Sequence, residues 1–170
     1  MSISTITDTR QYLTFQLGEE IFALDVVHVR EILEFSVITK VPKTPDYMRG
    51  VINLRGSVVP VLDMRMKFGF PKTEKTIDTC IIVVEASFDE EITIVGVLVD
   101  AVEEVFELEP DQIEPAPKIG IKLNMEYIKG MGKRDDKFII ILDINKVFTV
   151  EELLPVNEME YDENINMTAN

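Results

Sequence analysis

The alternation of apolar and polar residues near the N-terminus predicts a β-hairpin. Apolar side chains recur at every second position of residues 12–17, and a Gly-Glu-Glu turn leads into a second apolar segment, residues 21–24. Asp25 then offers N-cap chemistry to the segment DVVHVREIL, whose apolar residues fall at helical spacing. We expect a short helix there, although its β-branched valines also suit a strand.

A proline-rich break separates this segment from the next predicted hairpin. Residues 42–46 read Pro-Lys-Thr-Pro-Asp and interrupt regular structure. After the break, residues 51–54 and 58–62 have the composition of strands, and the Arg-Gly turn between them favours a hairpin. Asp63 is placed to cap a short helix over residues 64–68.

An edited copy of one segment, residues 47–68, returns as residues 127–148. A single offset of 80 positions aligns the two copies without a gap. The identical pairs include Tyr47 and Tyr127, Gly50 and Gly130, Asp63 and Asp143, and Phe68 and Phe148. A repeat of this length approaches the size of a small domain, so we infer one module that was duplicated and fused.

The second module repeats the predicted order of the first. Strands are expected over residues 79–84 and 92–99, Asp100 mirrors Asp25, and residues 101–108 take the place of the helix and the following strand. Many short strands joined by Gly, Pro and acidic turns predict an all-β fold with short helices. The duplication predicts two small β-barrels packed side by side.

We expect one domain over residues 11–154. Its first barrel would cover about residues 11–70 and its second about residues 76–150, with the end strands open to exchange between them. The expected tails are residues 1–10, which are polar, and residues 155–170, which are polar and acidic; both compositions favour flexibility.

Composition and charge narrow the classes of function. No apolar run approaches the roughly 20 residues of a membrane span, and the N-terminus has no apolar leader, so we expect a cytoplasmic protein without direct membrane insertion. The net charge of −14 disfavours nucleic acid and anionic membrane surfaces as partners. The single Cys80 lies in the apolar run CIIVV, which predicts a buried, inert thiol in a reducing compartment.

The residue types that catalysis needs are sparse. A carboxylate pair formed by Asp63 and Asp143 is the sharpest enzyme hypothesis, but the residues that follow each aspartate suit helix capping better. His28 is the single histidine, so no histidine metal cluster or triad is available. The glycines lack the spacing of phosphate loops, and the glutamate clusters lack the pattern of calcium loops. We therefore expect no enzyme activity, no metal and no cofactor.

Arg55 is the residue that the first copy has and the second copy lacks. It stands between Leu54 and Gly56 in the predicted turn. An arginine there can be a solvated turn residue, or it can anchor a partner, because its planar guanidinium binds a carboxylate or carbonyl with two hydrogen bonds. Both interpretations stay open from the residues alone.

Several long motifs resemble the CheW coupling proteins of bacterial chemotaxis. They are TFQLGEEIFALDVVHVREIL, TPDYMRGVINLRGSVVPVLDMR, GVLVDAVEEV and EYIKGMGKRDDKFIIILDINKVF, within a match over about residues 12–154. The resemblance implies two SH3-like five-stranded β-barrel subdomains. It also implies a non-enzymatic adaptor that joins the cytoplasmic tips of methyl-accepting chemoreceptors to the regulatory domain of the histidine kinase CheA, in membrane-associated receptor arrays.

The resemblance also implies a receptor-binding set, which is Leu13, Val26, Val29, Glu31, Ile32, Gly50, Arg55 and Val102. No short motif marks the kinase contacts of that family, which lie at barrel-to-barrel edges. As the kinase-binding set we nominate Val41, Met48 and Arg49. We expect helix-in-groove recognition of the receptor, with Val26 and Val29 as plain core residues in the alternative.

Three rival functions remain. Two belong to the same fold, namely the regulatory domain of CheA itself and the N-terminal half of a CheV-type coupler; the chain shows no kinase segment and no room for a receiver domain. The third is a barrel that binds a small ligand or hydrolyses a peptide, which the single histidine and the capping aspartates disfavour.

Overall fold

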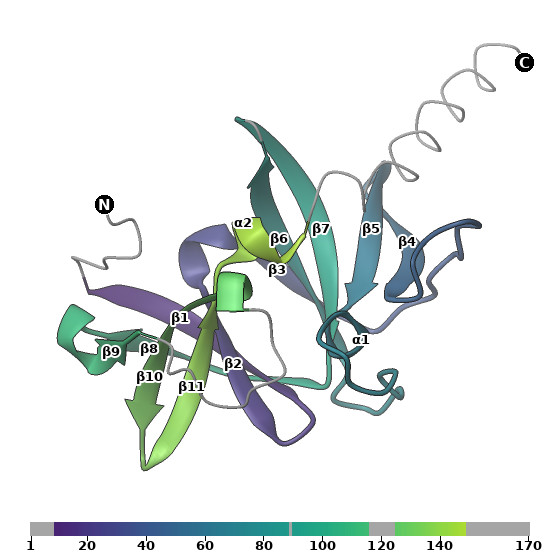
Figure 1. The fold of residues 1–170 in the computed structure, drawn as a ribbon. Coiled ribbons are helices and arrows are strands. Elements are labelled where there is room, and N and C mark those ends of the chain that lie inside the picture. The colour runs from purple at the N-terminus through teal and green to yellow at the C-terminus, as the bar shows by residue number, and fades with distance from the viewer. Residues whose placement is uncertain (1–8, 89, 116–124, 149–170) are drawn as a thin grey trace, which may run out of the picture.

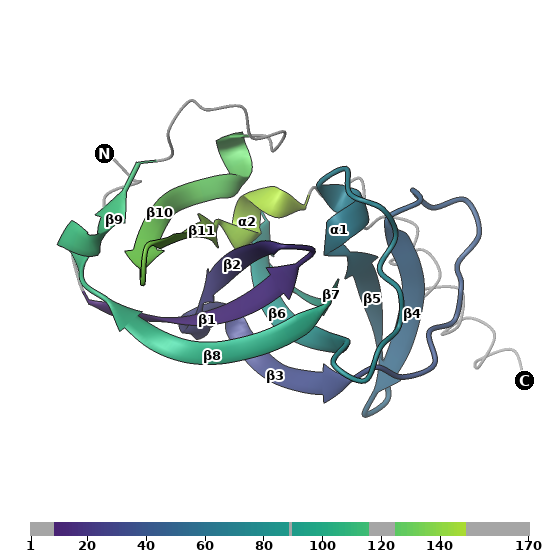
Figure 2. The ribbon, with the colours of Figure 1, turned by 90° about the horizontal axis from the view of Figure 1, so that it is seen from below.

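The chain folds into two strongly curved β-sheets that lie side by side (Figures 1 and 2). A computed structural model describes residues 9–88, 90–115 and 125–148 of the 170-residue chain. The expected acidic tail, residues 155–170, lies outside the described residues. The all-β class with a few short helices is confirmed.

The first sheet has six strands and the second has five. The six strands, in spatial order, are β8 (Ala101–Leu108), β1 (Arg10–Leu17), β2 (Glu20–Asp25), β11 (Lys137–Leu142), β10 (Ile128–Arg134) and β9 (Ile113–Glu114). The five strands are β3 (Val29–Glu34), β6 (Cys80–Phe88), β7 (Glu91–Val99), β5 (Ser57–Asp63) and β4 (Met48–Leu54). The two-residue β9 is the one strand without a full counterpart in the other sheet.

Each sheet combines strands from both halves of the sequence. The N-terminal hairpin β1–β2 joins the sheet of β8 to β11, and β2 pairs in parallel with β11. The hairpin β6–β7 joins the sheet of β3 to β5, and β7 pairs in parallel with β5. The expected division near residues 70–76 therefore does not coincide with the division between the sheets.

Short helices follow the strands at the predicted aspartates. Asp63 caps α1 (Met64–Lys67) and Asp143 caps α2 (Ile144–Val147), and each side chain accepts a backbone N–H of the first turn. Three 3₁₀ turns, η1 (Val26–His28), η2 (Pro110–Gln112) and η3 (Met125–Tyr127), complete the helical elements of the described residues.

The helix expected after Asp25 is wrong beyond its first turn. Asp25 accepts the N–H of Val27 at 3.0 Å and caps only the three residues of η1. The chain then extends into β3, where Val29 pairs with Val84 and Ile32 with Ile82. Because β-branched residues lose side-chain freedom in a helix and pack well in a sheet, pairing with β6 overrides the helical spacing.

The core consists of three apolar clusters. One lies within the six-stranded sheet around Tyr12 and Ile141, and a second lies within the five-stranded sheet around Ile81. The third and largest packs side chains of both sheets together, among them Phe15 and Ile82. Alternate residues of one strand thus face different clusters, which is the period expected of a strand.

The two copies repeat the same local devices. The N–H of Asp63 donates to the carbonyl of Tyr47 at 2.7 Å, and the N–H of Asp143 donates to the carbonyl of Tyr127 at 2.8 Å. The pairing of β4 with β5 shifts register just before Gly50, and the pairing of β10 with β11 shifts at the equivalent point. The duplication seen in the sequence is therefore a duplication of geometry.

The described helices are short, and none of them is long and apolar enough to cross a membrane.

Candidate interaction surfaces

Arg55, the residue singled out in the first copy, forms a bidentate ion pair with Glu31. Its two terminal nitrogens each donate to one carboxylate oxygen of Glu31 at 2.8 Å. Arg55 and Gly56 both have positive φ, 51° and 88°, in the two-residue turn between β4 and β5. Two members of the expected receptor-binding set are thus in direct contact.

This ion pair joins the two edges of the five-stranded sheet. Glu31 lies on β3 and Arg55 follows β4, and these strands are the first and last of that sheet. An isolated bridge also pairs Val51 of β4 with Thr39, in the segment that follows β3. The pair is therefore a closing contact of the curved sheet as well as a charged group at the surface.

The contact changes the protonation chemistry of both partners. The hydrogen bonds from Arg55 lower the pKa of the Glu31 carboxyl from its ordinary value. The same bonds raise the pKa of the Arg55 guanidinium. Since Arg55 is exposed, its charge and remaining hydrogen-bonding capacity are accessible to a partner.

The apolar members of the expected receptor-binding set differ in burial. Leu13 is buried in the largest core cluster. Val26, Val29 and Val102 are half-buried against that cluster, so each has a core side and a surface side. Ile32 is 45% exposed on β3. Leu13 is therefore a core residue, whereas Val26 and Val29, for which a core role was the alternative, keep part of their surface exposed.

Two further valines, on the elements that carry Val26 and Val102, are exposed and were not among the expected residues. Val27 of η1 is 64% exposed and Val105 of β8 is 51% exposed. Val27 lies between Val26 and His28, and in the expected helix its side chain would have pointed away from the face of Val26 and Val29. Because the segment forms a 3₁₀ turn and a strand, its helical spacing did not predict which valines are exposed.

Gly50 belongs to the backbone of the site and presents no side chain to a partner. It is buried and has φ of +143°, and a Cβ built on it would lie 2.1 Å from the carbonyl oxygen of Thr39. A side chain here would separate β4 from the segment that bridges to it. Its part in any interaction is to hold the two edges of the sheet together.

The three expected kinase-binding residues lie together and line one groove of about 310 Å³. Two further apolar residues, Pro45 and Met66, line the groove together with Val41, Met48 and Arg49. Lys40, Lys72, Thr44 and Asp46 complete the lining. Met66 and Lys72 were missed by sequence reasoning because they lie far along the chain from Val41, Met48 and Arg49; Lys40 was missed although it directly precedes Val41.

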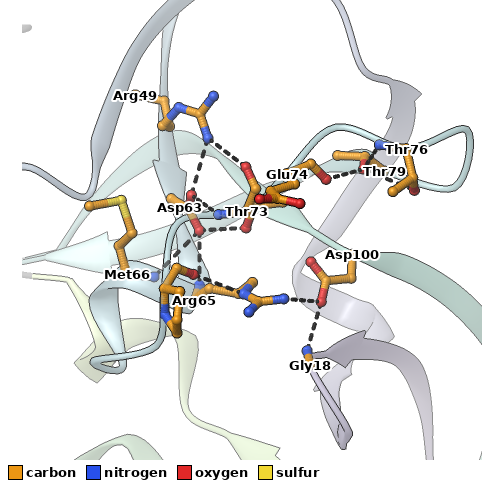
Figure 3. A network of polar contacts seen from close by, with 11 residues as sticks. Gly18, Arg49, Asp63, Arg65, Met66, Thr73, Glu74, Thr76, Thr79 and Asp100 are labelled. Atoms are coloured by element: carbon orange, nitrogen blue, oxygen red, sulfur yellow. Dashed lines mark hydrogen bonds and ion pairs between the residues drawn. The ribbon is translucent and has the colours of Figure 1, made fainter.

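The side chain of Asp63 fixes Arg49 in the groove (Figure 3). Arg49 donates to Asp63 at 3.2 Å and to the carbonyl of Thr73 at 3.4 Å. Thr73 donates to the same carboxylate from its N–H at 3.0 Å and from its hydroxyl at 2.7 Å. Because Asp63 is fully buried, these bonds replace the water that its charge would otherwise need.

The polar network continues from α1 to the other sheet. Arg65, on α1, donates to Asp100 at 2.9 Å, and Asp100 accepts the N–H of Gly18 at 2.6 Å (Figure 3). Gly18 is in the turn between β1 and β2, so the network crosses from the five-stranded sheet to the six-stranded sheet. Asn145 of α2 makes the reciprocal contact by accepting the N–H of Ser87 at 2.8 Å.

The residues considered for catalysis are engaged in structure. The carboxylates of Asp63 and Asp143 cap α1 and α2, as expected. Cys80 is half-buried where full burial was expected, because it lies at the first position of β6. Burial raises the pKa of its thiol, which keeps the less reactive protonated form. Within the described residues, no three His, Cys, Asp or Glu side chains gather as a metal site.

The fold and these surfaces define a duplicated β-domain that carries charged and apolar groups on its surface. A family model described as CheW-like domain matches residues 11–152. The chain therefore belongs to the CheW family.

Individual relatives agree over most of the chain. Chemotaxis protein CheW of Klebsiella aerogenes is 35% identical over 150 residues, which are 88% of this chain and 88% of that protein. Chemotaxis protein CheW of Thermotoga maritima is 35% identical over 146 residues, 84% of this chain and 89% of that protein. A crystal structure of the scaffolding protein TtCheW from Thermoanaerobacter tengcongensis superimposes with a TM-score of 0.75 at 37% identity, covering 84% of this chain and 90% of that one.

Proposed function

We propose that this chain is a non-enzymatic coupling protein of chemotaxis, which binds a chemoreceptor tip on one surface and the regulatory domain of the kinase CheA on another. Its membership of the CheW family, whose relatives include a scaffolding protein, supports the class. The partners follow from the resemblance to that family. In the cell, the chain would be cytoplasmic and would be recruited to membrane-associated receptor arrays through these partners.

The observation that supports two separate partners is the placement of two arginines at opposite ends of β4. Arg49 is the second residue of β4 and lines the groove, whereas Arg55 follows the last residue and pairs with Glu31. At about 3.3 Å per residue, the six steps between them span about 20 Å. Two proteins can therefore bind these ends without competing for the same residues.

The receptor surface would combine Arg55 with the half-buried valines. Val26 of η1 and Val29 of β3 offer partly exposed apolar area, and Val102 offers it on β8. A helical receptor tip can lay apolar residues on such a surface while a guanidinium at the rim fixes its register. To bind a partner carboxylate with both terminal nitrogens, Arg55 would have to release Glu31.

The kinase surface would be the groove of Val41, Met48 and Arg49. Its apolar floor and positioned guanidinium have the chemistry of an interface anchor, because arginine held in place loses little side-chain entropy on binding. The network of Asp63 and Arg65 would then connect this surface mechanically to the sheet that contains Val102.

Isothermal titration with the isolated CheA regulatory domain and with a receptor-tip fragment tests this assignment. Arg55→Ala should weaken receptor binding about tenfold or more and leave kinase binding unchanged. Val41→Asp, in the groove, should do the reverse, and Asp135→Ala, at the position equivalent to Arg55, is the matched control. Equal loss of both partners in either variant, or no heat with either partner for the unaltered chain, would refute the proposal.

A further inference from the structure

The positive charge of this acidic protein is concentrated in residues 40–75, the part of the chain that contains every residue lining the groove. Residues 40–75 contain eight of the chain's 17 lysine and arginine residues and only three acidic residues, a net charge of +5 in a chain of −14. Two of these cations, Lys40 and Lys72, are exposed at the groove. The groove is therefore cationic on a molecule that is otherwise strongly anionic, a contrast that attracts acidic ligands.

The cations of the groove are available to different degrees. Arg49 is partly neutralised by Asp63, and Asp46 is the single carboxylate that lines the groove. Among the described residues, neither Lys40 nor Lys72 forms an ion pair. These two ammonium groups face solvent beside the apolar side chains of Val41, Pro45, Met48 and Met66.

The chain itself contains a segment of matching chemistry. Residues 151–163 read EELLPVNEMEYDE and carry six carboxylates, no lysine or arginine, and apolar residues between the acidic ones. Most of this segment lies beyond residue 152, where the match to the family ends. Acidic groups can pair with the two lysines while leucine, valine and methionine side chains contact the apolar floor.

The segment is also close enough to reach the groove. Phe148, the last described residue, is buried in the core cluster that also contains Met48. Ten further residues in an extended chain span up to about 35 Å. A compact domain of about 140 residues has a radius of gyration of about 14 Å, so this span is comparable with the diameter of the domain. A tethered ligand of this kind has an effective concentration in the millimolar range.

We propose that residues 151–163 dock in the groove of Lys40, Arg49 and Lys72 and compete there with the kinase domain. The competition rests on the proposed function, because that function assigns the groove to the kinase. The docking itself rests only on the charge and shape of the groove and on the sequence of the segment. Binding of the kinase domain would then require displacement of the segment. The apparent affinity for the kinase domain is reduced in proportion to the fraction of molecules whose groove is unoccupied.

Zero-length carbodiimide cross-linking of the full chain, read by mass spectrometry, tests the docking. We expect Lys40 and Lys72 to cross-link to carboxylates of residues 151–163 about fivefold more than Lys137, an exposed lysine of the β10–β11 hairpin. The excess should vanish in 1 M salt, where screening acts over about 3 Å. Equal yields for the three lysines would overturn the docking, as would cross-links found only between labelled and unlabelled chains, which would identify a second copy as the occupant.

Titration with the kinase domain tests the competition separately. A full-length variant with Glu151, Glu152, Glu158, Glu160 and Glu163 changed to Gln and Asp162 to Asn should bind that domain about fivefold more tightly than the unaltered chain. Unchanged affinity would overturn the competition. If the kinase domain binds neither protein while the cross-links persist, the proposed function fails and the docking stands.

Discussion

The two copies of the duplicated segment, residues 47–68 and residues 127–148, share a backbone and differ in what their side chains hold. Both have a buried glycine beside a register shift, an aspartate that caps a short helix, and a buried phenylalanine at the end. In the first copy, however, the capping carboxylate of Asp63 also holds Arg49 and Thr73. In the described structure, the carboxylate of Asp143 accepts only the N–H of Asn145.

The hairpin turns differ in the same direction. Arg55 in the first copy reaches Glu31 on another strand, whereas the equivalent Asp135 and the following Asp136 form an acidic turn with the same positive φ angles. Three residues of the first copy, Met48, Arg49 and Met66, also line the groove, whose other lining residues lie just before or after that copy in the sequence. The comparison indicates that the shared residues maintain the fold and that the first copy has acquired additional contacts suited to binding.

The largest difference between the copies is expected at their glycines. Gly50→Ala would place a methyl group against the backbone of Thr39 at a φ of +143°, so we expect unfolding free energy to fall by about 4 kcal/mol. Gly130→Ala meets the Cγ2 methyl of Ile113 at 2.7 Å and the carbonyl oxygen of Glu114 at 3.1 Å, but without the positive φ, and should cost about 2 kcal/mol. Urea unfolding of both variants measures the two losses, and equal losses would contradict the asymmetry.

The two capping aspartates should rank next. Asp63→Ala removes a buried carboxylate with several donors and leaves Arg49 without its charged partner, so we expect a loss of about 3 kcal/mol. Asp143→Ala removes one capping hydrogen bond and should cost about 1 kcal/mol. Thermal unfolding of the two variants at the same pH tests the ranking. A larger loss of stability for Asp143→Ala than for Asp63→Ala would contradict it.

Local chemistry was predictable from the sequence, and long-range pairing was not. The caps at Asp63 and Asp143 follow from N-cap chemistry over a few residues, and the duplication follows from a constant offset. By contrast, the alternation of the β1–β2 hairpin is the same whether the hairpin pairs with strands of its own module or with strands of the second module. Its place beside β8 and β11 depends on contacts far apart in the chain.

The candidate surfaces show the same limit. Glu31 and Arg55 were both expected in the receptor-binding set, but their direct contact depends on the curvature that joins β3 to β4. Val29 was expected on a helix because spacing alone cannot weigh the pairing with Val84 against helix propensity. Three residues of the groove were nominated from the sequence, and only the structure adds Lys40 and Lys72 to it.

A smaller effect is expected where the copies meet. The ammonium of Lys67 lies 4.6 Å from the ring centroid of Tyr47 and 5.7 Å from that of the equivalent Tyr127. The position equivalent to Lys67 is Val147, which is fully buried. Lys67→Met keeps the length of the side chain and removes the charge, so we expect a loss of about 1 kcal/mol in urea unfolding. A gain in stability would show that the desolvation of the ammonium outweighs its attraction to the rings.

The smallest effect on stability should come from the turns, where protonation gives a sharper measurement. Arg55→Ala removes the hydrogen bonds that lower the pKa of Glu31, so that pKa should rise toward its ordinary value in carboxyl NMR titration. Because the folded-state pKa is the lowered one, the contribution of the pair to stability is full above the ordinary pKa of a glutamate. It is lost as pH falls through the lowered value.

The difference in melting temperature between Arg55→Ala and the unaltered chain should therefore shrink as pH falls through that range. Asp135→Ala in the equivalent turn is the control and should leave the titration of Glu31 unchanged. An unchanged pKa of Glu31 in Arg55→Ala would mean that the ion pair does not persist in solution. Arg55 would then be free for a partner from the start, and receptor binding would not need to break a contact within the chain.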